Sequence, residues 1–315
     1  MSAKLIPGPL RWKLLILSMC ISLLGKAQNT PLTVLPFDLK NDNRIYIKCR
    51  INQSDSLTFL FDTGADVMVI NQDILGKKLN LMMDSEMGNL GANGNSKLKV
   101  STKNTLSFGN ITAGNISLMA IPYGKSPFDG VFGSNLMKDY VIEIDYHKKL
   151  IRFYANKNYV YDTGAYDTIN LKSLSGVFTT TASLTVDNKT IEGEFEIDTG
   201  GDGGLIISSN FSTSNHLFER LTSVAKATAV GSDGTKSVSP IVIIPEIILK
   251  DKHFYRIPAL LSNTDSGLLA SKGLSGIFGN GFLKRFDVIL DIQNSRIFLK
   301  INDLIHTPYY DWLIK

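Results

Sequence analysis

Two aspartates in this sequence open the same triplet, Asp-Thr-Gly, and each follows a strand-like run. Asp62 comes directly after residues 57–61, and Asp198 comes directly after residues 193–197. A carboxylate placed there is costly unless its charge is shared or hydrogen-bonded, so placing it there twice suggests that the two side chains meet. Two adjacent carboxyls hold one proton between them over a wide pH range. Such a pair can activate a water with its charged member and protonate a carbonyl oxygen or a leaving group with the other.

The remaining residues of each triplet suit the same arrangement. Gly64 and Gly200 let the backbone turn tightly and approach both carboxyls, which a Cβ would hinder. Thr63 and Thr199 provide hydroxyls that can tie each loop to the opposite half of the molecule. The triplets therefore predict two loops that meet face to face.

The triplets belong to a longer internal repeat, which places them in equivalent surroundings. Three pairs of blocks match in the same order, at offsets that drift between 136 and 146 residues. These pairs are 57–66 with 193–202, 90–94 with 230–234, and 130–154 with 276–300. We therefore expect two homologous lobes, each of which supplies one aspartate. The expected boundaries are 1–27 for a leader, 28–160 for the first lobe, 161–170 for a linker, 171–301 for the second lobe and 302–315 for a tail.

Strand signals dominate both halves. Runs rich in Ile, Val, Phe, Thr and Tyr alternate with Gly, Asn, Asp and Ser turns, which predicts an all-β fold. Helix patterns are few and short. They cover residues 71–79, 136–140, 209–221 and 282–286. Cys49, the one cysteine outside the expected leader, alternates with isoleucines and is expected on the buried face of a strand rather than as a nucleophile.

The charge of the chain resides in its first segment. Lys and Arg total 33 against 29 Asp and Glu, and residues 1–27 hold four of the bases and no acid. The remainder, with 29 of each, lacks the basic excess that nucleic-acid binding requires. A composition of 43% hydrophobic and 20% charged residues is typical of a globular protein.

Residues 1–27 have the pattern of a secretory signal peptide. A basic stretch ends at Lys13, an apolar run follows over 14–24, and Ala27 gives a small-residue cleavage site. The apolar run is shorter than the roughly 20 residues that span a bilayer, so a retained anchor is the weaker interpretation. Cys20 suggests a lipoprotein, but Met19 precedes it where such signals carry a small residue. We expect an exported bacterial protein, periplasmic or extracellular, with no stable membrane span.

The motifs around the triplets resemble those of the aspartic proteases. Residues 62–70, DTGADVMVI, are close to the DTGAD-x-x-V-[LI] signature of the retroviral-type branch. Residues 128–133, FDGVFG, echo the F-D-G-[IV]-[LF]-G of pepsin-like lobes, and the resemblance covers essentially the whole chain after the leader. It implies a bilobal pepsin/retropepsin-like double barrel with one active site at the lobe interface. It also implies an aspartic endopeptidase that acts on peptides or proteins, without a cofactor or metal, as a single-chain monomer.

The third repeated block corresponds to the flap region of that family. Each copy contains a glycine turn between strands, a strong hairpin signal. The residues concerned are Gly91, Ala92, Asn93 and Gly94 in the first lobe and Gly231, Ser232, Asp233 and Gly234 in the second. The resemblance implies that these hairpins cover a bound peptide, the alternative being ordinary surface turns.

The sequence departs from the family in several places. Ala65 and Gly201 stand where pepsin-like enzymes carry Ser or Thr, so we expect a less acidic optimum than that of pepsin. No flap tyrosine is evident near Gly91. The arginine that pairs with the second aspartate of DTGAD has no evident counterpart, so the roles of Asp66 and Asp202 stay open.

A third Asp-Thr-Gly, beginning at Asp162, falls between the repeats and is expected to be a linker turn. A catalytically inactive, peptide-binding relative is the main alternative function. A glycoside hydrolase also uses two carboxylates, but only two tryptophans, Trp12 and Trp312, are present for a carbohydrate platform. A metal site built from the four aspartates of the two blocks has no histidine near it.

Overall fold

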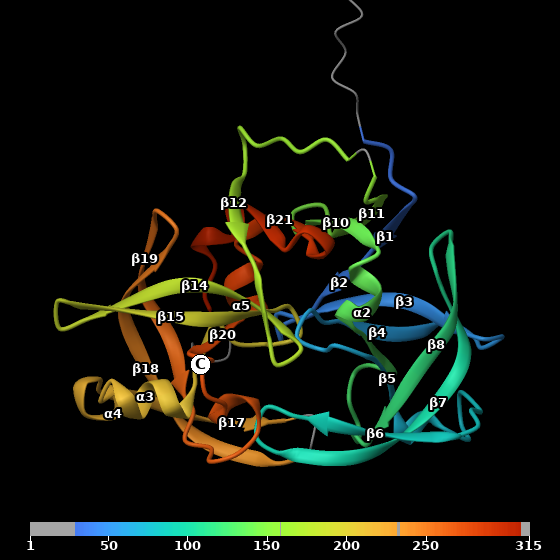
Figure 1. The fold of residues 1–315 in the computed structure, drawn as a ribbon, viewed down its shortest axis with the longest axis horizontal. Coiled ribbons are helices and arrows are strands. Elements are labelled where there is room, and N and C mark those ends of the chain that lie inside the picture. The colour runs from blue at the N-terminus through green and yellow to red at the C-terminus, as the bar shows by residue number, and fades with distance from the viewer. Residues whose placement is uncertain (1–28, 158, 232–233, 310–315) are drawn as a thin grey trace, which may run out of the picture.

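The structure is a computed structural model that describes residues 29–157, 159–231 and 234–309. The expected leader, 1–27, lies outside these residues. Strands dominate the regular structure of the described chain and are arranged as two eight-stranded sheets and one six-stranded sheet (Figure 1). The predicted all-β, two-lobed fold is therefore confirmed. No helix in the described part of the chain is long and apolar enough to cross a membrane.

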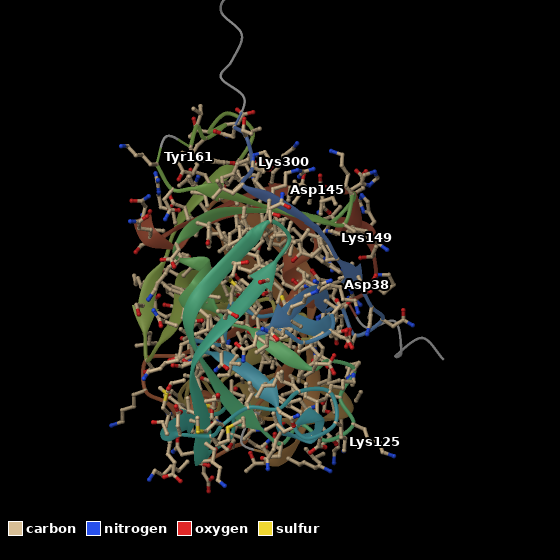
Figure 2. The ribbon with its side chains drawn as sticks, turned by 90° about the vertical axis from the view of Figure 1, so that its right-hand side faces the viewer. Asp38, Lys125, Asp145, Lys149, Tyr161 and Lys300 are labelled. Atoms are coloured by element: carbon tan, nitrogen blue, oxygen red, sulfur yellow. The ribbon has the colours of Figure 1, made fainter. Side chains whose placement is uncertain are left out.

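The first lobe is built on one eight-stranded sheet, and Figure 2 views this lobe face-on, with the long β7–β8 hairpin across its front. In spatial order the strands are β2 (Asp38–Leu39), β3 (Ile45–Ile51), β4 (Leu57–Phe61), β9 (Gly130–Phe132), β5 (Met68–Asn71), β8 (Ile111–Ile121), β7 (Asn95–Phe108) and β6 (Ser85–Leu90). The parallel pair β4–β9 lies near its centre, with Phe61 opposite Phe132. Because β4 leads directly into Asp62, this pair fixes where the first triplet begins.

The second lobe repeats this order of strands. Its sheet runs β13 (Lys172–Leu174), β14 (Val177–Val186), β15 (Lys189–Asp198), β20 (Gly276–Gly279), β16 (Leu205–Ile207), β19 (Lys252–Leu261), β18 (Lys236–Leu249) and β17 (Ser223–Val230). The parallel pair β15–β20 takes the place of β4–β9, with Asp198 opposite Gly279. The sequence repeat is thus also a repeat of sheet topology.

A six-stranded sheet joins the lobes. Its order is β1 (Thr33–Pro36), β11 (Leu150–Ala155), β10 (Tyr140–Asp145), β21 (Phe286–Asp291), β22 (Arg296–Ile301) and β12 (Asp167–Asn170). The central pair β10–β21 brings one strand from each repeat together, with Ile142 opposite Leu290. The last residues of the segment expected to be a linker are therefore a strand of this sheet.

Aromatic side chains fill equivalent places in the two lobes. Phe61 stacks on Phe132 with ring centroids 5.7 Å apart, and Phe195 lies 5.2 Å from Phe278. All four are fully buried. Burial of each such side chain contributes roughly 1.5–3 kcal/mol, so these pairs hold β4 and β15 firmly beneath the triplet loops.

Short helices interrupt the strands. They are α2 (Ser134–Met137), α3 (Ser209–Ser214), α4 (Leu217–Arg220), α5 (Asn280–Leu283) and the 3-10 turns η1 (Gln72–Ile74), η2 (Leu268–Ala270), η3 (Ile292–Asn294) and η4 (Asp303–His306). The helix predicted over 71–79 is wrong beyond η1, because Leu75 is extended and Gly76 has a positive φ of 75°. The helix predicted over 209–221 is broken at His216, which is left-handed at φ 54°.

Two further features of the sequence have clear positions. Cys49 is buried in β3, and burial raises the pKa of its thiol, so it is an inert core residue. In the C-terminal tail, the ring of Tyr309 stacks against the Arg285 guanidinium, whose carbon lies 3.6 Å from the ring centroid. Residues 310–315 of the tail lie outside the described residues.

Candidate functional site

The two triplet loops leave their sheets in the same way. The Asp62 N–H donates to the Phe132 carbonyl at 3.1 Å, which continues the β4–β9 ladder into the loop. Each lobe has a Gly-x-Phe-Gly element, at residues 130–133 in the first lobe and 276–279 in the second. The residue that follows this element holds the turn after each triplet. Ser134 N–H donates to the Ala65 carbonyl at 2.7 Å, and Asn280 N–H donates to the Gly201 carbonyl at 2.7 Å. The two loops are thus positioned by equivalent contacts.

The threonines of the triplets tie the loops to each other. The Thr63 hydroxyl donates to the Ile197 carbonyl at 2.6 Å and accepts from the Thr199 N–H at 3.0 Å. The Thr199 hydroxyl donates to the Phe61 carbonyl at 2.9 Å and accepts from the Thr63 N–H at 3.1 Å. Both threonines are buried, so this reciprocal network fixes the lobe interface at the triplets.

Replacing Thr199 with Val is therefore expected to destabilise the protein by about 2–4 kcal/mol, because it leaves a buried N–H and a buried carbonyl without partners. Urea unfolding measures this loss. Thr199→Ser keeps the hydroxyl and is the matched control, expected to stay within about 1 kcal/mol of wild type. Equal stability of the Val variant and wild type would contradict the role of the network.

The carboxyls of Asp62 and Asp198 share a hydrogen bond across the interface. Each also lies against the glycine of the opposite triplet. A Cβ on Gly200 would stand 2.3 Å from Asp62 Cγ, and a Cβ on Gly64 would stand 2.9 Å from Asp198 Cγ. Both carboxyls remain partly exposed, so a ligand can reach them.

The surroundings of the two carboxyls differ. Asp62 Oδ1 accepts from the N–H groups of Gly64 at 2.8 Å and Ala65 at 3.1 Å, and Asp198 Oδ1 accepts from the Gly200 N–H at 2.7 Å. Burial raises the pKa of Asp62, while the hydrogen bond from Asp198 and the backbone N–H groups oppose that rise. Burial, then the charge of Asp62, raises the pKa of Asp198 well above its usual range. These directions favour Asp198 as the protonated member of the pair and Asp62 as the ionised one.

An arginine near the pair was missed by the sequence analysis. Arg44, just before β3, places Nη2 3.2 Å from Asp202 Oδ2 in the other lobe, and its charge lowers the pKa of Asp62. The expectation that Asp202 has no arginine partner is thus wrong. The family resemblance places such an arginine just after residue 133 or residue 279, whereas the partner of Asp202 is Arg44. No local pattern in the sequence links the two positions. Asp66 is exposed, with Oδ2 3.1 Å from where a Cβ on Gly176 would stand.

Tyr123 was also missed. It follows β8, and its ring packs edge-on against Phe128 with ring centroids 5.0 Å apart. The charges of both aspartates act on its pKa. Burial, then the charge of Asp62, raises the pKa of its phenol, which stays protonated. A neutral phenol beside the carboxyls can donate a hydrogen bond to a ligand.

The first glycine turn, 91–94, joins β6 to β7 and reaches across to the second lobe. Leu268 N–H donates to the Gly91 carbonyl at 2.9 Å, and Leu269 N–H donates to the Ala92 carbonyl at 3.0 Å. The hydroxyls of Ser266 and Thr264 donate to the Asn93 carbonyl at 2.7 and 3.3 Å. We name these contacts the hairpin bridge.

The second glycine turn joins β17 to β18. Gly231 N–H donates to the Thr235 carbonyl at 3.0 Å, and Gly234 N–H donates to the Gly231 carbonyl at 3.0 Å. Ser232 and Asp233 lie outside the described residues. Both copies of the third repeated block are therefore hairpin turns, and a role in substrate binding stays a prediction.

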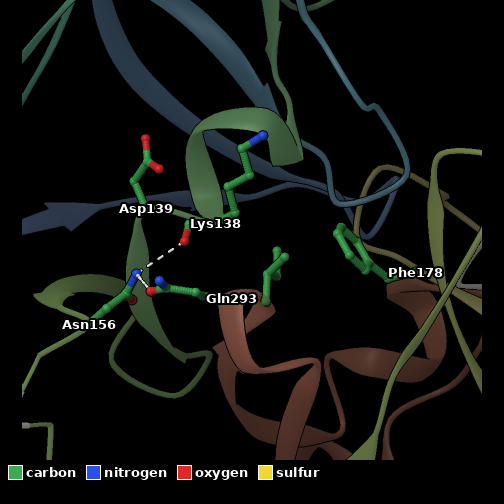
Figure 3. Close-up of a pocket in the computed structure, with 6 residues that line it drawn as sticks. Lys138, Asp139, Asn156, Phe178 and Gln293 are labelled. Atoms are coloured by element: carbon green, nitrogen blue, oxygen red, sulfur yellow. Dashed lines mark hydrogen bonds between the residues drawn. The ribbon is translucent and has the colours of Figure 1, made fainter.

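Other sequence features lie away from the pair. Asp162 is exposed in the segment between β11 and β12. A pocket of about 430 Å³ between the lobes is lined by Lys138, Asp139, Asn156, Phe178, Ile292 and Gln293 (Figure 3). The side-chain amide of Asn156 donates hydrogen bonds to Gln293 Oε1 and to the Lys138 carbonyl. Neither aspartate of the pair lines this pocket. In the described part of the chain, no group of three or more His, Cys, Asp or Glu side chains is placed to hold a metal ion.

Comparison with known proteins agrees with this geometry. Residues 47–136 match the family model described as aspartyl protease. Among solved structures, the aspartic proteinase from Irpex lacteus superimposes with a TM-score of 0.57 at 13% sequence identity, over 88% of this chain and 99% of that one. No curated protein matches the sequence significantly. The family match covers the first lobe, and the shared fold extends over both.

Proposed function

This chain belongs to the aspartic protease family, and we propose that it is an exported endopeptidase in which Asp62 and Asp198 activate the water that attacks the peptide bond. The observation that supports this most strongly is the meeting of the two carboxyls at the lobe interface, each against the glycine of the opposite triplet. The expected leader supports export.

The unequal surroundings assign different roles to the two carboxyls. Asp62, with two backbone N–H donors and the Arg44 charge, is the ionised member and takes a proton from water. Asp198 gives its proton to the carbonyl oxygen as the water oxygen bonds to the carbonyl carbon. When the carbon–nitrogen bond then breaks, Asp62 returns its proton to the leaving nitrogen, and Asp198 recovers one from the diol. Protons balance over the cycle, and no cofactor takes part.

We propose that the hairpin β6–β7 holds an extended peptide. Its tip reaches from the first lobe onto the second, where it accepts hydrogen bonds from Leu268 and Leu269. Strands at such an edge recognise a peptide through backbone hydrogen bonds, which suits cleavage within a chain rather than at its ends.

Digestion of a peptide library by the protein, without its leader, at several pH values tests the proposed function. Product sequences that show both new termini of an internal bond are expected. Cleavage is also expected to be blocked by a peptide that carries a tetrahedral, hydroxyl-bearing carbon in place of the scissile carbonyl. Recovery of bound but intact peptides at every pH would instead support the inactive peptide-binding alternative.

The pH optimum is expected to lie above about pH 3.5. The active form appears as the pair loses its first proton, and the pKa of Asp62 is raised above its ordinary value of 3.8 by burial. The acidic limb of kcat/KM is therefore expected above that value. The missing hydroxyls at Ala65 and Gly201 act in the same direction, because no side-chain donor there stabilises the ionised form. A pH–rate profile measures this limb, and a maximum below about pH 3.5 would contradict the expectation.

A further inference from the structure

A third carboxyl, that of Glu196, lies beside the pair. Glu196 is two residues before Asp198 on β15, so both side chains leave the same face of the sheet. Its exposed fraction is 2%. The equivalent residue of the first lobe is Leu60, which lies in an apolar cluster with Val131 and Tyr46. The repeat therefore has a carboxyl on one side of the interface and a leucine on the other.

The contacts of Glu196 place its carboxyl against the active-site loops. A Cβ on Gly64 would stand 2.8 Å from Glu196 Oε1 and 2.9 Å from Asp198 Oδ1, so both oxygens lie close to one point. On the flanking strands, Thr179 and Ile277 are the paired residues. Glu196 Oε2 is buried and has no hydrogen-bond partner among the described residues.

These surroundings disfavour a charge on Glu196. Burial, then the charges of Asp198 and Asp62, raises its pKa well above the usual range. Of the other charged or titratable groups at the site, Arg44 lowers the pKa of Asp62, and the pKa of Tyr123 is itself raised by burial and by the two aspartates. A neutral carboxylic acid has an O–H to donate, whereas a carboxylate can only accept. Buried acids that stay neutral near pH 7 serve other enzymes as hydrogen-bond donors in this way.

We propose, on the basis of the peptidase mechanism above, that Glu196 is a positioning residue that stays protonated and donates a hydrogen bond to Asp198. Asp198 becomes negative when its proton passes to the carbonyl oxygen, and the Glu196 O–H stabilises that charge. Glu196 itself neither gains nor loses a proton, and no covalent bond to it forms. Leu60 has no such group, so the first lobe offers Asp62 no equivalent donor, and the arrangement assists proton transfer from Asp198 alone.

The kinetic test compares Glu196→Leu with Glu196→Gln. The Leu variant, which copies the first lobe, is expected to lose roughly 10- to 100-fold in kcat with little change in KM, because a donor to a charged group is removed. Its alkaline limb is expected to move to higher pH, since Asp198 loses a group that stabilises its ionised form. The Gln variant keeps an N–H donor and is expected to stay within about 5-fold of wild type, with its limb nearly unmoved.

A purely structural role predicts different results. Leucine would then be the better occupant of an apolar site, and the Leu variant would match wild type in kcat and pH profile. That result overturns the proposal, as does a shift of the alkaline limb to lower pH in both variants, which would show that Glu196 is ionised. The melting temperature of each variant is measured alongside, and the Leu variant is expected to melt no lower than wild type, because it buries no unpaired oxygen.

Infrared spectroscopy tests the protonation without reference to activity. The difference spectrum between wild type and Glu196→Gln at pH 7 is expected to contain the carbonyl band of a protonated carboxylic acid. A carboxylate band in its place overturns the proposal. If wild type cleaves no peptide while the protonated band is present, the proposed function fails at the level of the enzyme and the protonation of Glu196 stands.

Discussion

Asp62→Asn and Asp198→Asn are each expected to lower kcat/KM by at least about 10³-fold, with the fold intact. Asparagine has the shape of aspartate, and its amide oxygen can still accept from the Gly64 or Gly200 N–H. What it cannot do is take a proton from water or deliver one to a carbonyl. Because one proton is shared by the pair, loss of either carboxyl removes the working state, so the double variant is expected to be no worse than either single one.

The control for these variants is Asp162→Asn. Asp162 opens the third Asp-Thr-Gly of the chain and is exposed, so full activity is expected. Cleavage of a peptide substrate is followed by product formation, and circular dichroism checks the fold. Activity within about 10-fold of wild type in either variant of the pair would remove the proposed mechanism.

Gly200→Ala is expected to lower kcat/KM by roughly 10²-fold although it removes no polar group. The added Cβ would stand 2.3 Å from Asp62 Cγ and within 2.5 Å of both carboxyl oxygens. Asp62 is held by the Gly64 and Ala65 N–H groups, so relief of the clash must displace the carboxyl from those donors. A displacement of about 1 Å suffices for a loss of this size.

Gly114→Ala is the matched control, because a Cβ on Gly114, in β8, has nothing within 4 Å. This variant is expected to keep wild-type activity and stability. The comparison is made by kcat/KM and by melting temperature, since crowding at Gly200 is also expected to destabilise the interface by about 1–3 kcal/mol. Wild-type kinetics in Gly200→Ala would show that the carboxyls do not meet as described.

The repeat explains why so much of the fold was predictable from the sequence. Gly133 and Gly279 are tolerated only as glycine, since a Cβ there would stand 2.1 Å from the Val67 carbonyl oxygen or 2.4 Å from that of Gly203. Such backbone constraints fix the residue type at equivalent positions of the two lobes and therefore leave motifs that can be aligned. The same alignment set Glu196 against Leu60, but the neighbouring apolar residues made the position appear to be ordinary strand.

Features that depend on distant contacts, or on the backbone conformation of one glycine, could not be predicted. Arg44 meets Asp202 across 158 residues, and the two side chains share no pattern in the sequence. The short helix after β5 ends early because Gly76 adopts a positive φ, which an apolar periodicity does not reveal. The hairpin bridge depends likewise on Gly267, which has a φ of 75° and where a Cβ would stand 2.3 Å from the Gly94 nitrogen.

The hairpin bridge has a consequence for what the protein can digest. With the tip of β6–β7 hydrogen-bonded to residues 264–269, the two lobes and the hairpin form a closed ring of protein. Under the proposed function, a long substrate enters either by passing a free end through that ring or after the hydrogen bonds of the hairpin bridge have broken. A compact protein has neither a long unstructured end nor an unstructured internal segment that could reach the two aspartates. Under the proposed function, the rate at which a compact protein is cleaved is therefore expected to depend on its own local unfolding, so that unfolded chains are cleaved first.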